Sequence, residues 1–144
     1  MVDKLNRMSF GDRLSIALTK NQTPLCVGID PHISLMPSLF RGSSPKEQIE
    51  KLVSFSLACI EAAQGRVPAI KPQVALFEKF GAKGMEILQL IGRAGHDAGL
   101  LVIMDAKRGD IGSTSVAYAD AWLGENAPFY SDALTVNPFL GIDT

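Results

Sequence analysis

The feature that most constrains the fold is the run Leu100–Met104, an uninterrupted series of apolar residues. The charged residues Asp105, Lys107 and Asp110 follow it almost at once. A short, continuous apolar run is typical of a strand in a parallel sheet that is covered on both faces. Active sites of parallel α/β folds lie at the carboxyl ends of their strands. The sequence therefore predicts a buried parallel strand that ends in a polar site.

Three more segments have the composition of short strands: Leu25–Asp30, Ala69–Gln73 and Ala133–Val136. The strand starts fall near residues 25, 69, 100 and 132, so the last two spacings are 100 − 69 = 31 and 132 − 100 = 32. A (β/α)8 barrel of about 250 residues has about 31 residues per strand–helix unit. The period therefore favours a barrel, with an additional loop after the first strand.

Amphipathic helices are expected between these strands, at residues 10–18, 44–65, 80–98 and 114–123. The second of them opens with Ser44, Pro45 and Glu47, which is the pattern of a capping box with proline at the first helical position. Gly65 and Gly99 are expected to end the helices that precede them.

Strands that alternate with helices indicate an α/β fold with a parallel sheet and right-handed crossovers. We expect a single domain over residues 1–144, with a leading helix in 1–24 and strands 1 to 4 with their helices in 25–144. Four strand–helix units are half of a (β/α)8 TIM barrel, so the chain is expected to be the N-terminal portion of one. An open, doubly wound sheet of four strands is the alternative that the length allows.

Composition excludes several classes of function. The chain has 14 Lys and Arg residues against 15 Asp and Glu, a formal net charge of −1, which gives no electrostatic reason to bind nucleic acid or an anionic membrane. No apolar run approaches the about 18 residues of a membrane span, and the N-terminal residues lack the apolar core of a signal peptide. A cytoplasmic protein is expected. Cys26 and Cys59 are expected to be reduced core residues, His96 to lie on the surface, and no metal site is expected.

The charged residues after the strongest strand form the candidate site. Asp105 and Lys107 are two positions apart and therefore project from the same face of a strand. Lys71, at the end of the preceding strand, is placed to reach them, and Asp110 follows the flexible Gly109. Such a cluster of two lysines and two carboxylates keeps the carboxylates ionised and the amines protonated. It suits delivery of a proton to a carbanion beside a departing anion. Solvated residues with surface ion pairs are the alternative interpretation.

Several motifs together resemble one known family. KPQ at 71–73, DAKRGDI at 105–111 and DALTVNPFLG at 132–141 are similar to orotidine 5′-phosphate decarboxylases, and most similar to their longer bacterial subgroup. LCVGIDP at 25–31 resembles the first strand of that subgroup, and FEKFG at 77–81 its second strand–helix connection. The motifs occur in the family's order over nearly the whole chain.

The resemblance implies a TIM barrel that converts orotidine 5′-monophosphate to UMP in pyrimidine biosynthesis, without a metal or a cofactor. Lys107 would donate the proton to C6 of the pyrimidine, and Asp105 would lie beside the substrate carboxylate. Lys71 would hold Asp105 and contact the ribose, whose hydroxyls Asp30 would also contact. We further expect Asn137, at the tip of the fourth strand, to point into the mouth of the site.

The resemblance also implies a homodimer with shared active sites. The residues that match Asp110, Ile111 and Thr114 come from the second subunit in this family. Phosphate-binding residues of the family lie on later strands, consistent with the general position of phosphate sites in barrels. This chain alone is therefore expected to be inactive.

Two other functions stay open from the sequence. One is a magnesium-dependent sugar-phosphate lyase of the same superfamily, which would share the Asp-x-Lys-x-x-Asp pattern but carry a glutamate near the position of Lys71. The other is a non-catalytic half-barrel that self-associates through exposed strand edges.

Overall fold

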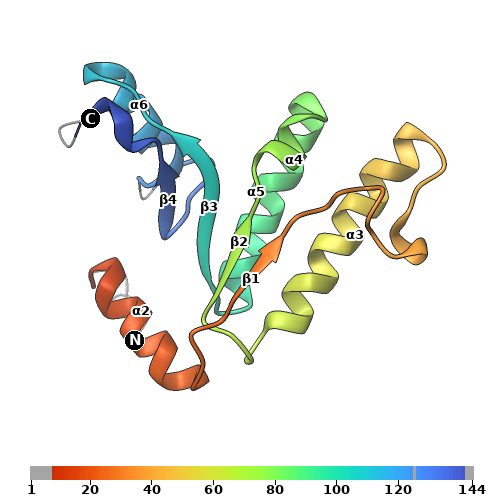
Figure 1. Cartoon of the computed structure of the whole chain (residues 1–144), viewed down its shortest axis with the longest axis horizontal. Helices are drawn as coiled ribbons and strands as arrows, with labels where there is room; N and C mark the ends of the chain where they lie inside the picture. The colour runs from red at the N-terminus through yellow and green to blue at the C-terminus, as the bar shows by residue number, and fades with distance from the viewer. Residues whose placement is uncertain (1–7, 125, 142–144) are drawn as a thin grey trace.

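Four parallel strands form one sheet in the order β1-β2-β3-β4 in the computed structural model, which describes residues 8–124 and 126–141 (Figure 1). Each strand pairs with the strand that precedes it in the sequence, and the order therefore never reverses as it does in a doubly wound sheet. This succession is the one expected of a barrel. The strands are β1 (Cys26–Ile29), β2 (Ala69–Pro72), β3 (Leu101–Arg108) and β4 (Ala133–Val136).

The predicted helices are present with small changes at their ends. They are α2 (Phe10–Asn21), α3 (Pro45–Ala63), α5 (Gly81–Asp97) and α6 (Gly112–Trp122), with the short helix α4 (Ala75–Glu78) and the 3-10 turns η1 (Ser38–Phe40) and η2 (Pro138–Leu140) in addition. At the start of α3 the hydroxyl of Ser44 accepts the backbone N–H of Glu47. The carboxylate of Glu47 reaches back to the N–H of Ser43, one residue earlier than in an ideal capping box.

The hydrophobic core lies between the sheet and the helices α3 and α5, which run side by side next to β1 and β2 (Figure 1). The helix α5 approaches β2 and β3 closely at Gly95. A methyl group at this position would lie 2.6 Å from Cδ1 of Ile70 and 2.9 Å from Cγ2 of Val102. Glycine therefore permits a helix–sheet distance that any larger residue would increase.

Alternation along the strands separates a face that packs against the helices from an opposite face of the sheet. Val27, Ile29 and Ile70 pack into the core, so their neighbours in sequence, including Cys26 and Lys71, project from the opposite face. Cys26 is consequently exposed, and the expectation that it is a core residue is wrong. An apolar stretch of sequence does not reveal which of its residues face the helices.

The other cysteine agrees better with its prediction. Cys59 is partly buried and packs against the core from α3. Both cysteines are free thiols. Partial desolvation by neighbouring atoms raises the pKa of each thiol above its ordinary value, for Cys26 against the opposing effect of the nearby Lys71 ammonium group.

Strand β3 continues beyond the residue at which the sequence pattern places its end. The apolar run stops at Met104, but the strand extends through Arg108. Met104 pairs with Leu134 and Arg108 pairs with Val136, so residues 105–107 of β3 lie opposite the single residue Thr135 of β4. This bulge lies within the charged motif and determines where its side chains point.

Polar contacts anchor the leading helix α2 to the end of the sheet at which the strands begin. Asp132, directly before β4, is buried and forms an ion pair with Arg13 of α2. Nε2 of His96 lies 3.0 Å from Oδ2 of Asp132. His96 is therefore part of a half-buried network, which corrects the expectation of a surface histidine. Within the described residues, no helix has the length and apolar character needed to cross a membrane.

Candidate active site

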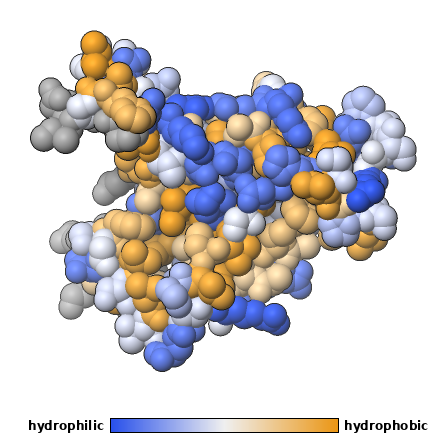
Figure 2. Space-filling model, viewed as in Figure 1, coloured by the Kyte–Doolittle hydropathy of each residue, from blue (hydrophilic) through white to orange (hydrophobic). Residues whose placement is uncertain are grey.

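Asp105 is the centre of the candidate site, at the carboxyl end of the sheet. This residue is 9% exposed. The Nζ atom of Lys71, from the end of β2, lies 2.7 Å from its Oδ2 atom, and Nζ of Lys107 forms an ion pair with its Oδ1 atom. The structure thus brings together three of the four residues of the predicted charge cluster. Figure 2 shows hydrophilic residues gathered in the upper half of the molecule, the direction in which β1, β2 and β3 run in Figure 1.

Two further side chains bind the same carboxylate, and sequence reasoning did not assign them a role. Nε2 of Gln73 donates to Oδ2 of Asp105 at 3.0 Å, and Oγ1 of Thr135 donates to its Oδ1 at 3.0 Å. A signal for Gln73 was available, because it lies two residues after Lys71 and therefore on the same face. Thr135 has no comparable signal, since its contact depends on the bulge in β3.

The contacts of Asp105 decide its charge. Burial by itself favours the protonated acid, but the hydrogen bonds from Lys107, Lys71 and Thr135 outweigh it, and the pKa of Asp105 lies well below its ordinary value of 3.8. The hydrogen bond to Asp105 raises the pKa of Lys71 against the opposing effect of burial, and the charges of Asp105 and Asp30 raise it further. Asp105 is thus a carboxylate at neutral pH, and Lys71 is an ammonium ion.

Asp30 lies at the same end of the sheet, directly after β1. Its side chain folds back toward the strand, and its Oδ2 atom lies 2.5 Å from the position that a Cβ atom on Gly28 would occupy. The residue is exposed, and its charge acts on Lys71. Asp30 therefore belongs to the same mouth as the predicted cluster, without an ion pair to it among the described residues.

Among the described residues, Asp110, Ile111 and Thr114 form no hydrogen bond or ion pair with Asp105 of the same chain. Oδ1 of Asp110 accepts the backbone N–H of Ile111 at 2.7 Å. Ile111 is the N-terminal cap residue of α6 and is 64% exposed, and Thr114 is exposed on the first turns of that helix. The same-chain cluster therefore contains two lysines and one aspartate, and Asp110 presents its side chain from the loop that starts α6.

Asn137 caps the turn that follows β4. Its Oδ1 atom accepts the backbone N–H of Phe139 at 3.1 Å. It also lines a cavity of about 430 Å³ whose wall includes Arg108, Gly109 and Tyr118. Asn137 thus lies at the tip of the fourth strand, but its side-chain oxygen already accepts a backbone hydrogen bond.

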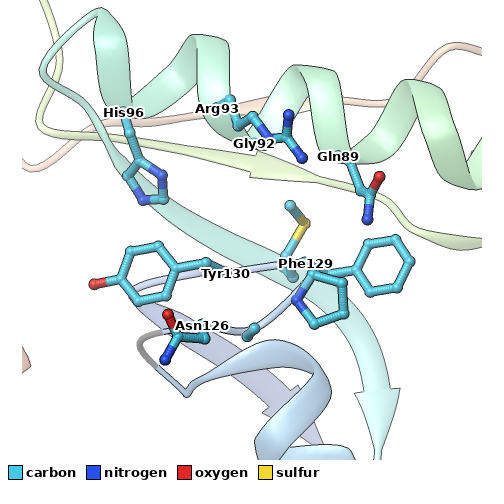
Figure 3. Close-up of a pocket in the computed structure, with 10 residues that line it drawn as sticks. Gln89, Gly92, Arg93, His96, Asn126, Phe129 and Tyr130 are labelled. Carbon is cyan, nitrogen blue, oxygen red and sulfur yellow. The ribbon is translucent and has the colours of Figure 1, made fainter.

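A second hollow lies on the core side of the sheet. It is formed by Gln89, Arg93 and His96 of α5 on one side and by the loop with Phe129 and Tyr130 on the other (Figure 3). None of the described residues that line it is a carboxylate, and its histidine already contacts Asp132. The hollow therefore has no counterpart of the carboxylate–lysine cluster around Asp105.

Comparison with known proteins agrees with the site and the fold. Residues 23–144 match the family model described as "Orotidine 5′-phosphate decarboxylase / HUMPS family". The chain belongs to this family. The matched residues include all four strands and every residue of the candidate site.

Family members align with almost the whole chain. An orotidine 5′-phosphate decarboxylase of Streptomyces coelicolor is 48% identical over 132 residues, and one of Rhodopirellula baltica is 41% identical over 145 residues. These alignments cover 92% and 95% of this chain but only 46% and 48% of the relatives. The chain thus spans about half the length of the curated relatives it matches.

Solved structures of the family have the same arrangement of elements. A crystal structure from Streptomyces avermitilis superposes with a TM-score of 0.84 at 47% identity, over 93% of this chain and 45% of the other. Leishmania donovani OMP decarboxylase superposes with a TM-score of 0.72 at 34% identity, over 94% of this chain and 47% of the other. The strand–helix units of this chain are therefore units of the family's TIM barrel.

Proposed function

We propose that the natural gene product decarboxylates orotidine 5′-monophosphate to UMP, and that this chain supplies Lys71, Asp105 and Lys107 of its active site. The observation that supports the proposal is the buried carboxylate of Asp105, whose two oxygens face the ammonium groups of two lysines. Family membership and the names of the relatives point to the same reaction.

Lys107 is the proton donor in this proposal. Decarboxylation breaks the bond between C6 of the pyrimidine and its carboxylate carbon, so the electron pair stays on C6 while carbon dioxide leaves. A proton from Nζ of Lys107 then forms the new C6–H bond, and the neutral amine regains a proton from water. The Lys107 side chain is 65% exposed although its Nζ contacts Asp105, so it is accessible to a ligand in the mouth of the site.

Asp105 and Lys71 prepare the charge distribution that this step needs. Asp105 is ionised before substrate binds and lies beside the substrate carboxylate, while the lysines stabilise the negative charge that develops at C6. Fixed charges of this kind need no reorganisation when the reaction occurs, which lowers the barrier. Asp30, on the neighbouring strand end, contacts the ribose hydroxyls, and Asn137 contacts the ligand from the far side of the mouth.

A homodimer with shared sites completes the charge array. Asp110 lies partly buried in the loop before α6, Ile111 and Thr114 are exposed at the start of that helix, and none of the three bonds to Asp105 within the described part of the chain. From there they reach the site of a second subunit and place the carboxylate of Asp110 next to Lys107. The residues that bind the substrate phosphate lie outside this chain, so residues 1–144 alone are inactive. The protein acts in the cytoplasm and binds neither nucleic acid nor membrane.

The reaction requires no metal ion or cofactor in this proposal. Both oxygens of Asp105 already accept hydrogen bonds from two ammonium groups, an amide and a hydroxyl. A divalent cation would have to displace the lysines from the carboxylate. The family name also includes the HUMPS enzymes, so magnesium-dependent sugar-phosphate chemistry is the competing function. Loss of activity in EDTA that magnesium restores would refute the metal-free mechanism.

Two measurements test the proposed function. The first is the intact mass of the natural gene product, because a mass of roughly 27 kDa is that of a complete barrel. The second is the loss of orotidine 5′-monophosphate absorbance, measured with that product and with residues 1–144 alone. Turnover by the first and none by the second is the expected result. A natural product of 15.5 kDa without turnover would favour the self-associating, non-catalytic half-barrel.

A further inference from the structure

We propose that Thr135 is a positioning residue for Lys107 and Asp105, a role that rests on the proposed function. Thr135 lies in β4 and does not need to touch the substrate. Its Oγ1 atom lies 3.0 Å from the backbone nitrogen of Lys107 and 3.0 Å from Oδ1 of Asp105. One hydroxyl group therefore links the backbone of the proposed proton donor to the carboxylate that its side chain binds.

The bulge in β3 creates the need for this hydroxyl. Residues 105–107 lie opposite Thr135 alone, so the N–H of Lys107 has no partner in a regular ladder with β4. Lys107 also has a φ of 53°, in the left-handed region that side chains other than glycine rarely adopt. The side chain of Thr135 takes the place of a backbone acceptor for this N–H. It thereby holds Lys107 in a conformation that is costly for an L-residue.

The directions of the hydrogen bonds follow from the chemistry of the groups. A backbone N–H only donates, so Oγ1 of Thr135 accepts from Lys107, and its own proton is then directed to Asp105. Oδ1 of Asp105 also binds Nζ of Lys107. The contacts form a closed ring through the backbone of Lys107, the hydroxyl, the carboxylate and the ammonium group of Lys107.

The ring fixes the position of the Lys107 amine. Threonine is branched at Cβ and has few rotamers, so its hydroxyl is held at a defined place on β4. Without the hydroxyl, the Lys107 backbone is free to leave the left-handed conformation, and the path of its side chain changes. Displacement of a reacting group by about 1 Å can lower a rate by about 10²-fold. Substrate binding does not require the same precision at this amine.

Kinetics of the natural gene product separate positioning from binding. Thr135→Val has nearly the same shape but no hydroxyl, and its kcat is expected to fall by about 10- to 100-fold while KM changes less than about twofold. Thr135→Ser retains the hydroxyl and is expected to recover kcat to within about threefold of the wild type. Equal kcat values in the wild type and Thr135→Val would overturn the proposal, as would a rise in KM that accounts for the whole effect.

Ser131→Ala is the matched control. Ser131 precedes the same strand, is buried, and donates its hydroxyl to the carbonyl oxygen of Trp122 at 2.9 Å. The variant is expected to lower Tm and leave kcat unchanged. If it lowers kcat as much as Thr135→Val does, the effect is one of general stability and the positioning role is wrong.

Amide hydrogen exchange provides a readout that does not depend on turnover. The Lys107 N–H loses its acceptor in Thr135→Val, so its exchange rate is expected to be at least about tenfold faster than in the wild type. In Thr135→Ser the exchange rate of this N–H is expected to equal that of the wild type. Unchanged exchange in Thr135→Val overturns the role of Thr135 even if the protein decarboxylates. If the wild-type protein does not decarboxylate the substrate, the proposed function is refuted instead. The exchange rate of the Lys107 N–H then still tests whether the Thr135 hydroxyl holds this backbone group. If Thr135→Val does not fold, Thr135→Ala and Thr135→Ser carry the same comparison.

Discussion

The carboxylate of Asp132 accepts the backbone N–H of Val102 at 2.6 Å, so a side chain substitutes for a strand backbone at the start of the β3–β4 pair. The same carboxylate contacts His96 and Arg13. These bonds join β3, β4, α5 and α2 at the end of the sheet opposite Asp105. A buried carboxylate with several donors is costly to alter, because its partners are left without an acceptor.

Asp132→Asn is expected to lower the free energy of unfolding by about 1–3 kcal/mol at pH 7. Burial raises the pKa of Asp132, but hydrogen bonds from His96 and Val102 and the charges of His96 and Arg13 lower it below 3.8 overall. A depressed carboxyl pKa stabilises the folded state above the ordinary pKa, and this stability is lost as the pH falls through the folded value. Denaturant unfolding between pH 7 and pH 3 should therefore show the difference between variant and wild type narrowing below about pH 4.

Asp97→Asn is the control for this pH dependence. Asp97 ends the helix α5 and is exposed. The substitution removes the same charge without removing a buried acceptor, so its effect on stability is expected to stay within about 0.5 kcal/mol. If the difference in free energy of unfolding between Asp132→Asn and the wild type does not depend on pH, the charge of the carboxylate does not contribute to stability.

Lys107→Ala in the natural gene product is expected to reduce kcat by at least about 10³-fold, since general acids contribute about 10²–10⁴ and electrostatic stabilisation is lost as well. Binding of UMP should change little, because the role proposed for Lys107 is in the chemical step. Steady-state kinetics and calorimetric titration with UMP measure the two effects. Near-normal turnover would rule out Lys107 as the proton donor.

Subunit mixing tests the shared site. Lys107→Ala and Asp110→Ala subunits, each poor alone, should regain activity when combined, since one hybrid site then contains both native residues. About a quarter of the wild-type activity is the upper limit for random mixing, because half of the dimers are hybrids and each has one intact site. Native mass spectrometry should confirm that heterodimers form. Heterodimers without any recovery would contradict the shared site.

Gly95→Ala is expected to destabilise residues 1–144 by about 1–3 kcal/mol through overpacking. The added methyl group would lie closer to Ile70 and Val102 than carbon atoms approach in proteins. Gly11→Ala, in α2, is the matched control, because the nearest atom to its methyl group lies 3.8 Å away. That control should be neutral or stabilising, since alanine favours the helix. Similar Tm losses in both variants would argue against a steric cause.

Residues 1–144 expressed alone are expected to self-associate. In the described sheet, β1 and β4 each pair with one strand only, and Leu25 and Val136 beside these edges are 65% and 59% exposed. Unpaired edges with apolar side chains pair with other chains. Size-exclusion chromatography at several concentrations should show species larger than 15.5 kDa. A single monomeric peak at all concentrations would contradict this expectation.

Local sequence patterns predicted most of the fold. The capping residue Ser44 and the apolar run before Asp105 mark element positions that the structure confirms within a few residues. Such signals are local, because they depend on residues that are near one another in the chain. The pairing of Lys71 with Asp105 was predictable too, since both lie at the carboxyl ends of adjacent parallel strands.

The remaining features depend on contacts between distant segments. The exposure of Cys26 depends on which face of β1 the helices cover, and the contact of His96 depends on a carboxylate 36 residues away. The role of Thr135 depends on the bulge in β3, and an apolar run followed by charges does not indicate a bulge. The proposed place of Asp110 in the site of a second subunit depends on contacts between chains, which a pattern within one chain does not describe.

The left-handed backbone of Lys107 implies a conflict between the stability of the fold and the proposed chemistry at one residue. Glycine adopts this conformation without steric cost, so Lys107→Gly relieves strain of about 1 kcal/mol or more, while three other donors still hold Asp105. The strain at Lys107 is thus the conformational cost of placing an amine, rather than a bare backbone, at the end of β3.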